Sequence, residues 1–158
     1  MEGKFTHFDE KGSAHMVDVT DKAVTKRIAV ARAIIKMNPQ TLKMIMDKGI
    51  SKGDVFGVAQ VAGIMGAKQT PSLIPMCHPL NITSVNIKFK TDVELSTVQI
   101  DATVSITGQT GVEMEALTAV TITALTIYDM CKSVDKTMVI TDIMLLEKSG
   151  GKSGNFVR

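Results

Sequence analysis

The chain has 158 residues, 44% of them hydrophobic, which is enough to bury the core of one domain. Its net charge of +2 and its aromatic content of 4%, with no Trp, argue against nucleic-acid binding. The two cysteines, Cys77 and Cys131, indicate a reduced compartment rather than a disulfide scaffold. The first ten residues lack the apolar core of a signal peptide, and the longest apolar run is too short to span a bilayer, so we expect a cytoplasmic protein.

The first 22 residues are polar and are predicted to form an N-terminal arm or loop. His7 and His15 lie in this arm, and neither has a second ligand nearby at a metal-binding spacing. We therefore interpret both histidines as solvated surface residues. A strand is predicted next, over 23–37, because small and β-branched residues alternate there, although part of this run also fits a helix.

Two helices are predicted after this strand. The first begins at Pro39, a favoured first helical residue, and ends near Gly49. The second is capped by Ser51, with Asp54 in its first turn. Lys52 sits where the helix dipole disfavours a cation, so it is either functional or a chance surface residue. The residues expected to be buried are Leu42, Ile45 and Met46 in the first helix and Val55, Val58, Ala59, Ala62 and Met65 in the second.

Residues 70–79 contain three of the four prolines and are predicted to be extended and stiff. Cys77 and His78 are held between Pro75 and Pro79, which makes them candidates for substrate contact. Adjacent Cys and His do not match a zinc-ligand spacing, so we expect no metal site. The apolar residues expected to anchor this loop are Leu73, Ile74 and Met76.

Alternation of apolar and polar residues predicts three further strands. Two of them, 85–89 and 98–106, are expected to pair as a hairpin through residues 91–96. The third is predicted over 138–146, after a long helix at 110–136.

The predicted helix at 110–136 carries Glu113 and Glu115 at its start and Asp129 and Lys132 near its end. Glu115 and Asp129 are fourteen residues apart, about 21 Å along an α-helix, so one small substrate does not reach both within one chain. If both ends serve one site, a second copy related by a twofold axis must bring its helix start beside the end of the first. The alternative is that the glutamates cap the helix and that Asp129 with Lys132 is an exposed pair.

The glycine-rich end of the chain, 147–154, lacks the Walker spacing, because Leu146 stands where a P-loop requires Gly. Accessible backbone N–H groups together with Lys148 and Lys152 are compatible with anion binding. A flexible solvated tail explains the same composition equally well.

These elements follow a βαββαβ plan when the two adjacent helices are counted as one. The plan is that of an α+β ferredoxin-like plait, an antiparallel sheet with helices packed on one face. We expect one domain over residues 1–158, with the arm at 1–22 and a glycine-rich C-terminal tail at 148–158.

Four stretches carry a family resemblance. They are HMVDVT at 15–20, KGDVFGVAQVAGIMGAKQTPSLIPMCHPL at 52–80, TGVEMEALTAVTITALTIYDMCKSVDK at 110–136 and KSGGKSG at 148–154. Together they resemble the cyclic pyranopterin monophosphate synthase family of molybdenum cofactor biosynthesis. Gln109 stands where many members of that family have a basic residue.

The resemblance implies a phosphorus–oxygen lyase that converts 3′,8-cyclo-7,8-dihydro-GTP to cyclic pyranopterin monophosphate and pyrophosphate. It implies a homohexamer, a trimer of dimers with sites at the dimer interfaces, and a functional link to the upstream radical enzyme that makes the substrate. No cofactor is implied, with Mg²⁺ left open as a counter-ion of the substrate triphosphate. Nucleic-acid and membrane partners are not expected.

The resemblance also implies roles for residues at matching positions. Asp129 is expected to be a catalytic acid/base, Lys132 its partner, and Lys52 another catalytic residue. We expect Lys148 and Lys152 to bind the substrate and to stabilise charge on the departing pyrophosphate. The other expected substrate contacts are Met76, Cys77, His78, Glu113, Met114 and Glu115.

Two other classes of function stay open at this point. One is a non-catalytic subunit that binds a nucleotide and hands it on, in which case bound substrate persists unchanged. The other is a structural oligomer module, in which Lys52, Asp129 and Lys132 are replaceable without functional loss.

Overall fold

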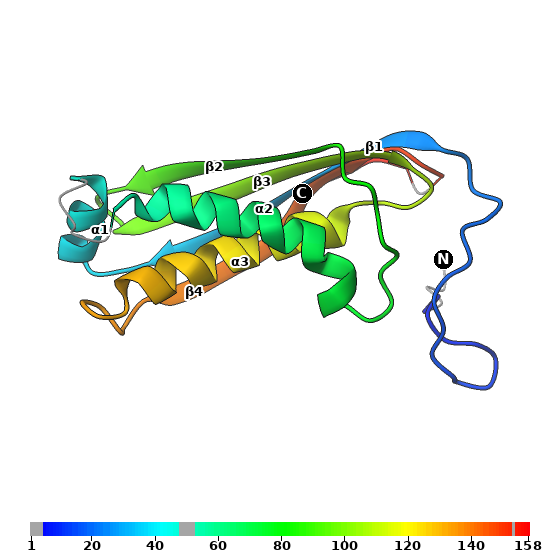
Figure 1. Cartoon of the computed structure of the whole chain (residues 1–158), viewed down its shortest axis with the longest axis horizontal. Helices are drawn as coiled ribbons and strands as arrows, with labels where there is room; N and C mark the ends of the chain where they lie inside the picture. Colours follow the sequence, from blue (N-terminus) through cyan, green and yellow to red (C-terminus); the bar gives the residue numbers. More distant parts are fainter. Residues whose placement is uncertain (1–4, 48–52, 153) are drawn as a thin grey trace.

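The computed structural model describes residues 5–47, 53–152 and 154–158. In chain order the elements are β1 (Thr25–Lys36), α1 (Pro39–Met46), α2 (Val55–Leu73), β2 (Ser84–Asp92), β3 (Thr97–Gly108), α3 (Glu113–Cys131), β4 (Val139–Ser149) and β5 (Phe156–Val157). The strands form one antiparallel sheet in the order β2-β3-β1-β4-β5. The two long helices, α2 and α3, lie side by side over one face of this sheet (Figure 1).

This arrangement confirms the predicted ferredoxin-like plait and adds β5 as an edge strand. The predicted hairpin is also correct, since β2 and β3 pair from Ser84 with Ser105 to Asp92 with Thr97. Helix α3 packs on β1, and both elements contribute small, fully buried side chains to the core, which allows their backbones to approach closely. These fully buried residues are Ala116, Ala119 and Ala124 of α3 and Ala29, Ala31 and Ala33 of β1.

The end of α2 differs from the prediction of an extended, stiff segment from residue 70. The helix runs through Pro71 to Leu73, and the extended backbone begins only at Ile74, whose N–H closes the helix on the Thr70 carbonyl. Pro71 is tolerated because it removes a single hydrogen bond in the last turn, where few others depend on it. Leu73, expected to be buried, is exposed, while Ile74 and Met76 are half-buried.

The buried stripe predicted for α2 is wrong in its orientation. Val55 and Ala59 are buried, but Val58 and Met65 are about half exposed. The reason is that α2 packs on α3 through glycines, which a hydrophobic-pattern argument does not count: a Cβ on Gly63 would lie 2.0 Å from Thr123 Oγ1. Met46 of α1 was also expected to be buried and is exposed.

The start of α2 is capped by Asp54 rather than by the predicted Ser51. The Asp54 carboxylate accepts a hydrogen bond from the Gly57 N–H at 3.0 Å, which satisfies a free donor of the first turn. Ser51 and Gly49, named in the predicted boundaries, lie outside the described residues.

The C-terminal segment is more regular than a flexible tail. Lys148 and Ser149 belong to β4, which continues past the predicted end at residue 146. Phe156 and Val157 then pair with Lys148 and Glu147, because the edge of β4 offers unpaired backbone groups. Residues 5–24 contain turns and one isolated bridge, Phe8 with Ala14, and no helix or longer strand. Among the helices of the described residues, none has both the length and the apolar character needed to cross a membrane.

Candidate active site

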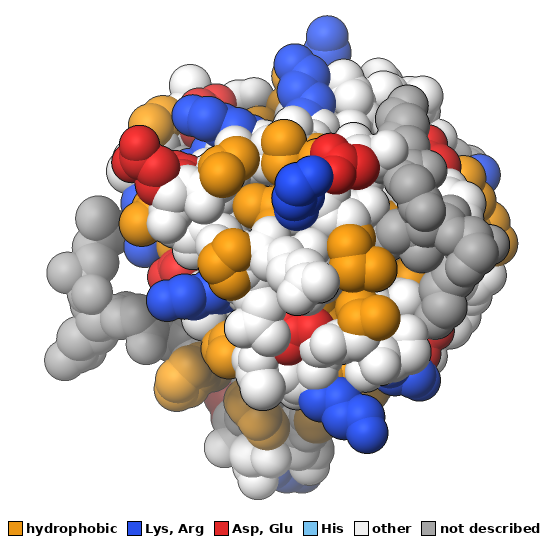
Figure 2. Space-filling model, turned by 90° about the vertical axis from the view of Figure 1, so that its left-hand side faces the viewer, with side chains coloured by type: hydrophobic (Ala, Val, Ile, Leu, Met, Phe, Trp, Pro, Cys, Tyr) orange, Lys and Arg blue, Asp and Glu red, His pale blue; other side chains and the backbone are white. Residues whose placement is uncertain are grey.

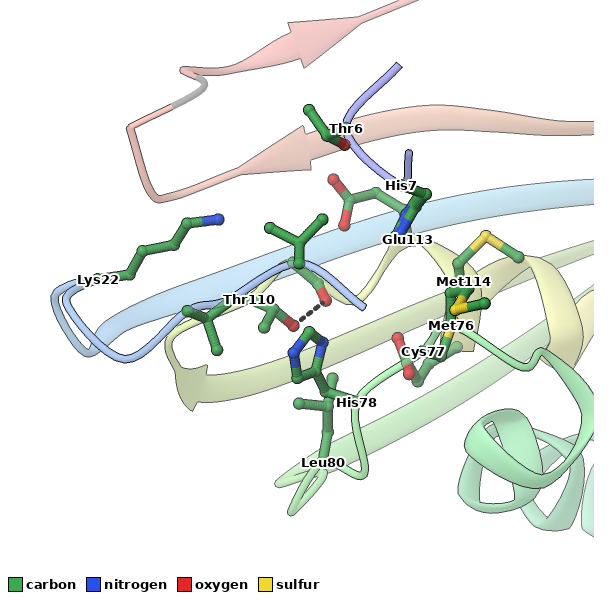
Figure 3. A pocket seen from close by; sticks show the side chains of 14 residues that line it. Thr6, His7, Lys22, Met76, Cys77, His78, Leu80, Thr110, Glu113 and Met114 are labelled. Carbon is green, nitrogen blue, oxygen red and sulfur yellow. Dashed lines mark hydrogen bonds between the residues drawn. The ribbon is translucent and has the colours of Figure 1, made fainter. Parts of the chain in front are cut away.

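A pocket of about 270 Å³ lies where the start of α3, the loop after α2 and the N-terminal arm meet (Figure 3). The loop contributes Met76, Cys77 and His78, and α3 contributes Glu113, Met114 and Glu115, so all six predicted contact residues of these two segments line one cavity. The remaining lining residues are Thr6, His7, Val17, Val19, Lys22, Leu80, Thr110 and Gly111. The walls combine apolar side chains with a few polar groups, as small-molecule sites do.

Glu115 is the most perturbed acid in this pocket. It lies in the first turn of α3 and is 2% exposed. Burial raises its pKa from 4.5 to about 7, and the neighbouring charge of Glu113 acts in the same direction, against a backbone hydrogen bond that favours the charged form. A carboxyl group with a pKa near neutrality can both give and take a proton, which suits general acid–base chemistry.

Cys77 and His78 are positioned by the turn that follows α2. The Cys77 N–H donates to the Ile74 carbonyl at 3.1 Å, which closes a turn and directs both side chains into the pocket. Burial raises the pKa of the Cys77 thiol, and the negative charge of Glu115 raises it further. A raised pKa favours the neutral thiol of Cys77, which is a weaker nucleophile than a thiolate.

Glu113 connects α3 to β4 through an ion pair. Its Oε1 lies 3.0 Å from Lys148 Nζ, so one predicted phosphate-binding lysine is at the rim of the pocket. Gly111 makes this geometry possible, because a Cβ there would lie 1.9 Å from Glu113 Oε2. The ion pair holds the Glu113 carboxylate over the backbone just before α3.

A second, basic cavity of about 380 Å³ adjoins the pocket, and Lys22 lines both. Arg27 and Lys152 supply two further positive charges to its walls. The Arg27 Nε donates to the Gly108 carbonyl at 2.9 Å, and its guanidinium packs on Gly151, where a Cβ would be 2.0 Å from Nη1. Two lysines and a fixed guanidinium form a site suited to phosphate groups.

Arg27 was not among the predicted site residues, although the sequence contains a signal for it. Every second residue of β1 from Arg27 onward is buried, so Arg27 lies on the same face of the strand as the core residues Ala29, Ala31, Ala33 and Ile35. A charged residue on a buried face is uncommon unless a partner or ligand needs it there. His7, interpreted as a solvated residue, is exposed but lines the pocket.

Asp129 and Lys132 lie at the other end of α3, near α1, and do not line the pocket (Figure 1). Lys132 Nζ is 2.5 Å from Asp129 Oδ1, and this hydrogen bond, with the Asp129 charge, raises the pKa of Lys132. The surface at this end mixes acidic, basic and hydrophobic side chains (Figure 2). Lys52, the third predicted catalytic residue, lies outside the described residues.

One chain therefore contains two separated groups of predicted site residues. Since α3 is one continuous helix, Glu115 and Asp129 are about 21 Å apart along it. Within residues 5–47, 53–152 and 154–158, no cluster of three or more His, Cys, Asp or Glu side chains is arranged to hold a metal ion.

Comparison with known proteins gives matches over nearly the full length. The MoaC family matches residues 16–151. A cyclic pyranopterin monophosphate synthase of Syntrophomonas wolfei is 64% identical over 154 residues, which cover 98% of each chain. A protein of the same name from Desulfitobacterium hafniense is 60% identical, and the match covers 98% of this chain and 94% of that protein. A third, from Dinoroseobacter shibae, is 61% identical, with 96% of each chain covered.

Proposed function

The chain belongs to the MoaC family, and on that premise we propose that it is a cyclic pyranopterin monophosphate synthase of molybdenum cofactor biosynthesis. Its substrate would be 3′,8-cyclo-7,8-dihydro-GTP, made by an upstream radical enzyme, and its products cyclic pyranopterin monophosphate and pyrophosphate. As an enzyme class this is a phosphorus–oxygen lyase.

The observation that carries the proposal is the pocket that gathers Met76, Cys77, His78, Met114 and Glu115 beside a basic cavity. A nucleotide-derived substrate needs both environments, one for its fused rings and one for its phosphates. Lys22, which lines both cavities, offers a positive charge between them. Figure 3 shows its side chain extending from the arm toward the pocket.

The proposed chemistry requires several proton transfers, because the guanine ring must open by reaction with water and the pterin must then close. Glu115, with a pKa of about 7, is suited to exchange protons with the ring system. Cyclisation of the phosphate expels pyrophosphate, and the positive charges of Lys148, Lys152 and Arg27 would stabilise the leaving group. Asp129 and Lys132 are proposed as a second acid–base pair.

We propose that each complete site uses two chains, in a homohexamer built as a trimer of dimers. The helix α3 keeps Glu115 and Asp129 too far apart for one small substrate, whereas an antiparallel copy brings opposite ends together. Exposed apolar side chains on the outer faces of the two long helices support burial of this layer against another chain. They are Val58, Val61, Met65 and Leu125.

The purified protein incubated with 3′,8-cyclo-7,8-dihydro-GTP tests the activity directly. We expect release of pyrophosphate together with the cyclic product, and no release from GTP. Replacement Asp129→Asn, which keeps the shape of the side chain, is expected to abolish turnover while substrate still binds. Substrate that binds to the wild-type chain and stays unchanged would instead indicate a non-catalytic nucleotide-binding subunit.

Mixing two inactive variants tests the two-chain site. If Glu115→Gln and Asp129→Asn subunits are refolded together at equal amounts, half of the dimers are mixed and each has one site with both native residues. About a quarter of the wild-type activity should therefore return, by the symmetry of a twofold interface. Activity that stays at zero in verified mixed oligomers contradicts a site shared between chains.

We also propose that no resident cofactor takes part, with Mg²⁺ entering only as a counter-ion of the substrate triphosphate. Turnover measured after treatment with a chelator, with and without added Mg²⁺, tests this. The free thiols of Cys77 and Cys131 support a reducing, cytoplasmic location.

A further inference from the structure

The N-terminal arm contains a closed turn that presents His7. The Asp9 carboxylate accepts hydrogen bonds from the N–H groups of Lys11 and Ser13, both at 2.8 Å. Across the turn, the His15 N–H donates to the His7 carbonyl at 3.0 Å, and Phe8 bridges to Ala14. The backbone at His7 is thus fixed by local hydrogen bonds rather than left to sample many directions.

The arm is attached to the pocket in the stretch that follows this turn. Gln109 Nε2 donates to the Thr20 carbonyl at 3.1 Å, which joins the arm to the connection between β3 and α3. Val17 and Val19 line the pocket. The Thr20 N–H and hydroxyl donate to the Asp18 carboxylate at 2.9 and 2.6 Å, and these hydrogen bonds lower the pKa of Asp18. These contacts make the arm one wall of the cavity.

His7 lies on that wall, and His78 enters from the opposite side (Figure 3). The Glu113 and Glu115 side chains and the apolar side chains of Met76 and Met114 line the same pocket. An imidazole both donates and accepts hydrogen bonds, as the polar edge of a purine-derived ring requires. We propose that His7 is a substrate-contacting residue, which the arm supplies to the pocket opposite His78. This inference rests on the proposed function for the identity of the substrate.

His15 provides a matched control, because it is in the same turn, is also exposed and does not line the pocket. Replacement His7→Gln removes the imidazole but keeps a polar side chain, and His15→Gln makes the same change outside the cavity. Loss of one hydrogen bond to the substrate is expected to lower kcat/KM about tenfold in the His7→Gln variant. The His15→Gln variant should match the wild type. Both variants should keep the wild-type denaturation midpoint, since both side chains are exposed.

Two results would overturn the inference. One is an unchanged kcat/KM in His7→Gln, and the other is an equal loss in both variants, which would assign the effect to the arm as a whole. If the wild-type chain releases no pyrophosphate, the proposed function fails by itself. Calorimetric binding of the same cyclic dihydro-GTP to the three proteins then decides the role of His7: weaker binding only in His7→Gln supports it, and equal binding in all three refutes it.

Discussion

Replacing Glu115 with Gln should change the pH dependence of the free energy of unfolding as well as the catalytic activity. In the folded chain its pKa is about 7, against 4.5 for an exposed glutamate, because burial and the charge of Glu113 disfavour the ionised form. The stabilisation that this group gives is therefore fully present below pH 4.5, the unfolded value, and is lost as the pH rises through 7. An amide at this position does not titrate, so Glu115→Gln should escape that loss.

The magnitude follows from the difference of about 2.5 pH units between the folded and unfolded values. At about 1.4 kcal/mol per unit, the free energy of unfolding of the wild type should fall by about 3 kcal/mol relative to the variant between pH 4.5 and pH 8. Most of the change should occur between pH 5 and pH 7. Above pH 7 the variant is expected to be the more stable protein while it has lost turnover.

Urea denaturation of both proteins at several pH values measures this difference. Every other titrating group is common to the two chains, so the comparison reports the titration of Glu115 together with its charge interactions with Glu113 and Cys77. Protein concentration must be held constant, because the stability of the proposed oligomer would depend on it. The variant Glu94→Gln controls for the loss of one carboxylate on an exposed turn. A difference between wild type and Glu115→Gln that is the same at pH 4.5 and at pH 8 would refute the raised pKa.

Three further predictions concern single positions. In Gly111→Ala, the new Cβ would lie 1.9 Å from Glu113 Oε2, so the Glu113 carboxylate should move away from Lys148. Assays of pyrophosphate release should then show kcat/KM lowered on the order of 100-fold, with little change in the free energy of unfolding. In Gly63→Ala, contacts of 2.0 Å to Thr123 Oγ1 and 3.0 Å to the Ala119 carbonyl should destabilise the chain by about 1–3 kcal/mol in urea titrations. Asp135→Asn should cost about 1–3 kcal/mol at neutral pH, because the buried carboxylate accepts hydrogen bonds from the N–H groups of Asn38 and Thr137. Burial acts to raise the pKa of Asp135, but these hydrogen bonds outweigh it and lower the pKa, so the difference from the wild type should shrink as the pH falls below about 4.

The sheet was predictable from the sequence because its strands bury one face. In β3, residues Val98, Ile100, Ala102, Val104 and Ile106 are all buried, and the intervening positions are more exposed. A one-residue shift in register would expose all five, so the alternation is compatible with only one register of the strand. The helix α3 was predictable for a similar reason, since its apolar positions recur at three and four residues.

The predictions failed where packing depends on small residues or on distant partners. The hydrophobic pattern of α2 assigns Val58 and Met65 to the core, but Gly63 and Gly66 lie against α3 instead. The place of His7 in the pocket depends on contacts between the arm and the β3–α3 connection, including Gln109 with Thr20, which are 89 residues apart. No local pattern encodes such a contact.

The continuity of α3 limits how this chain can change in evolution. One residue inserted between Glu115 and Asp129 would rotate one end of the helix by about 100° and shift it by 1.5 Å relative to the other. Insertions and deletions should therefore be absent from this interval in any relative that uses both ends. The turn between β2 and β3 has exposed residues at Val93, Glu94 and Leu95 and no part in the pocket, so length variation should accumulate there.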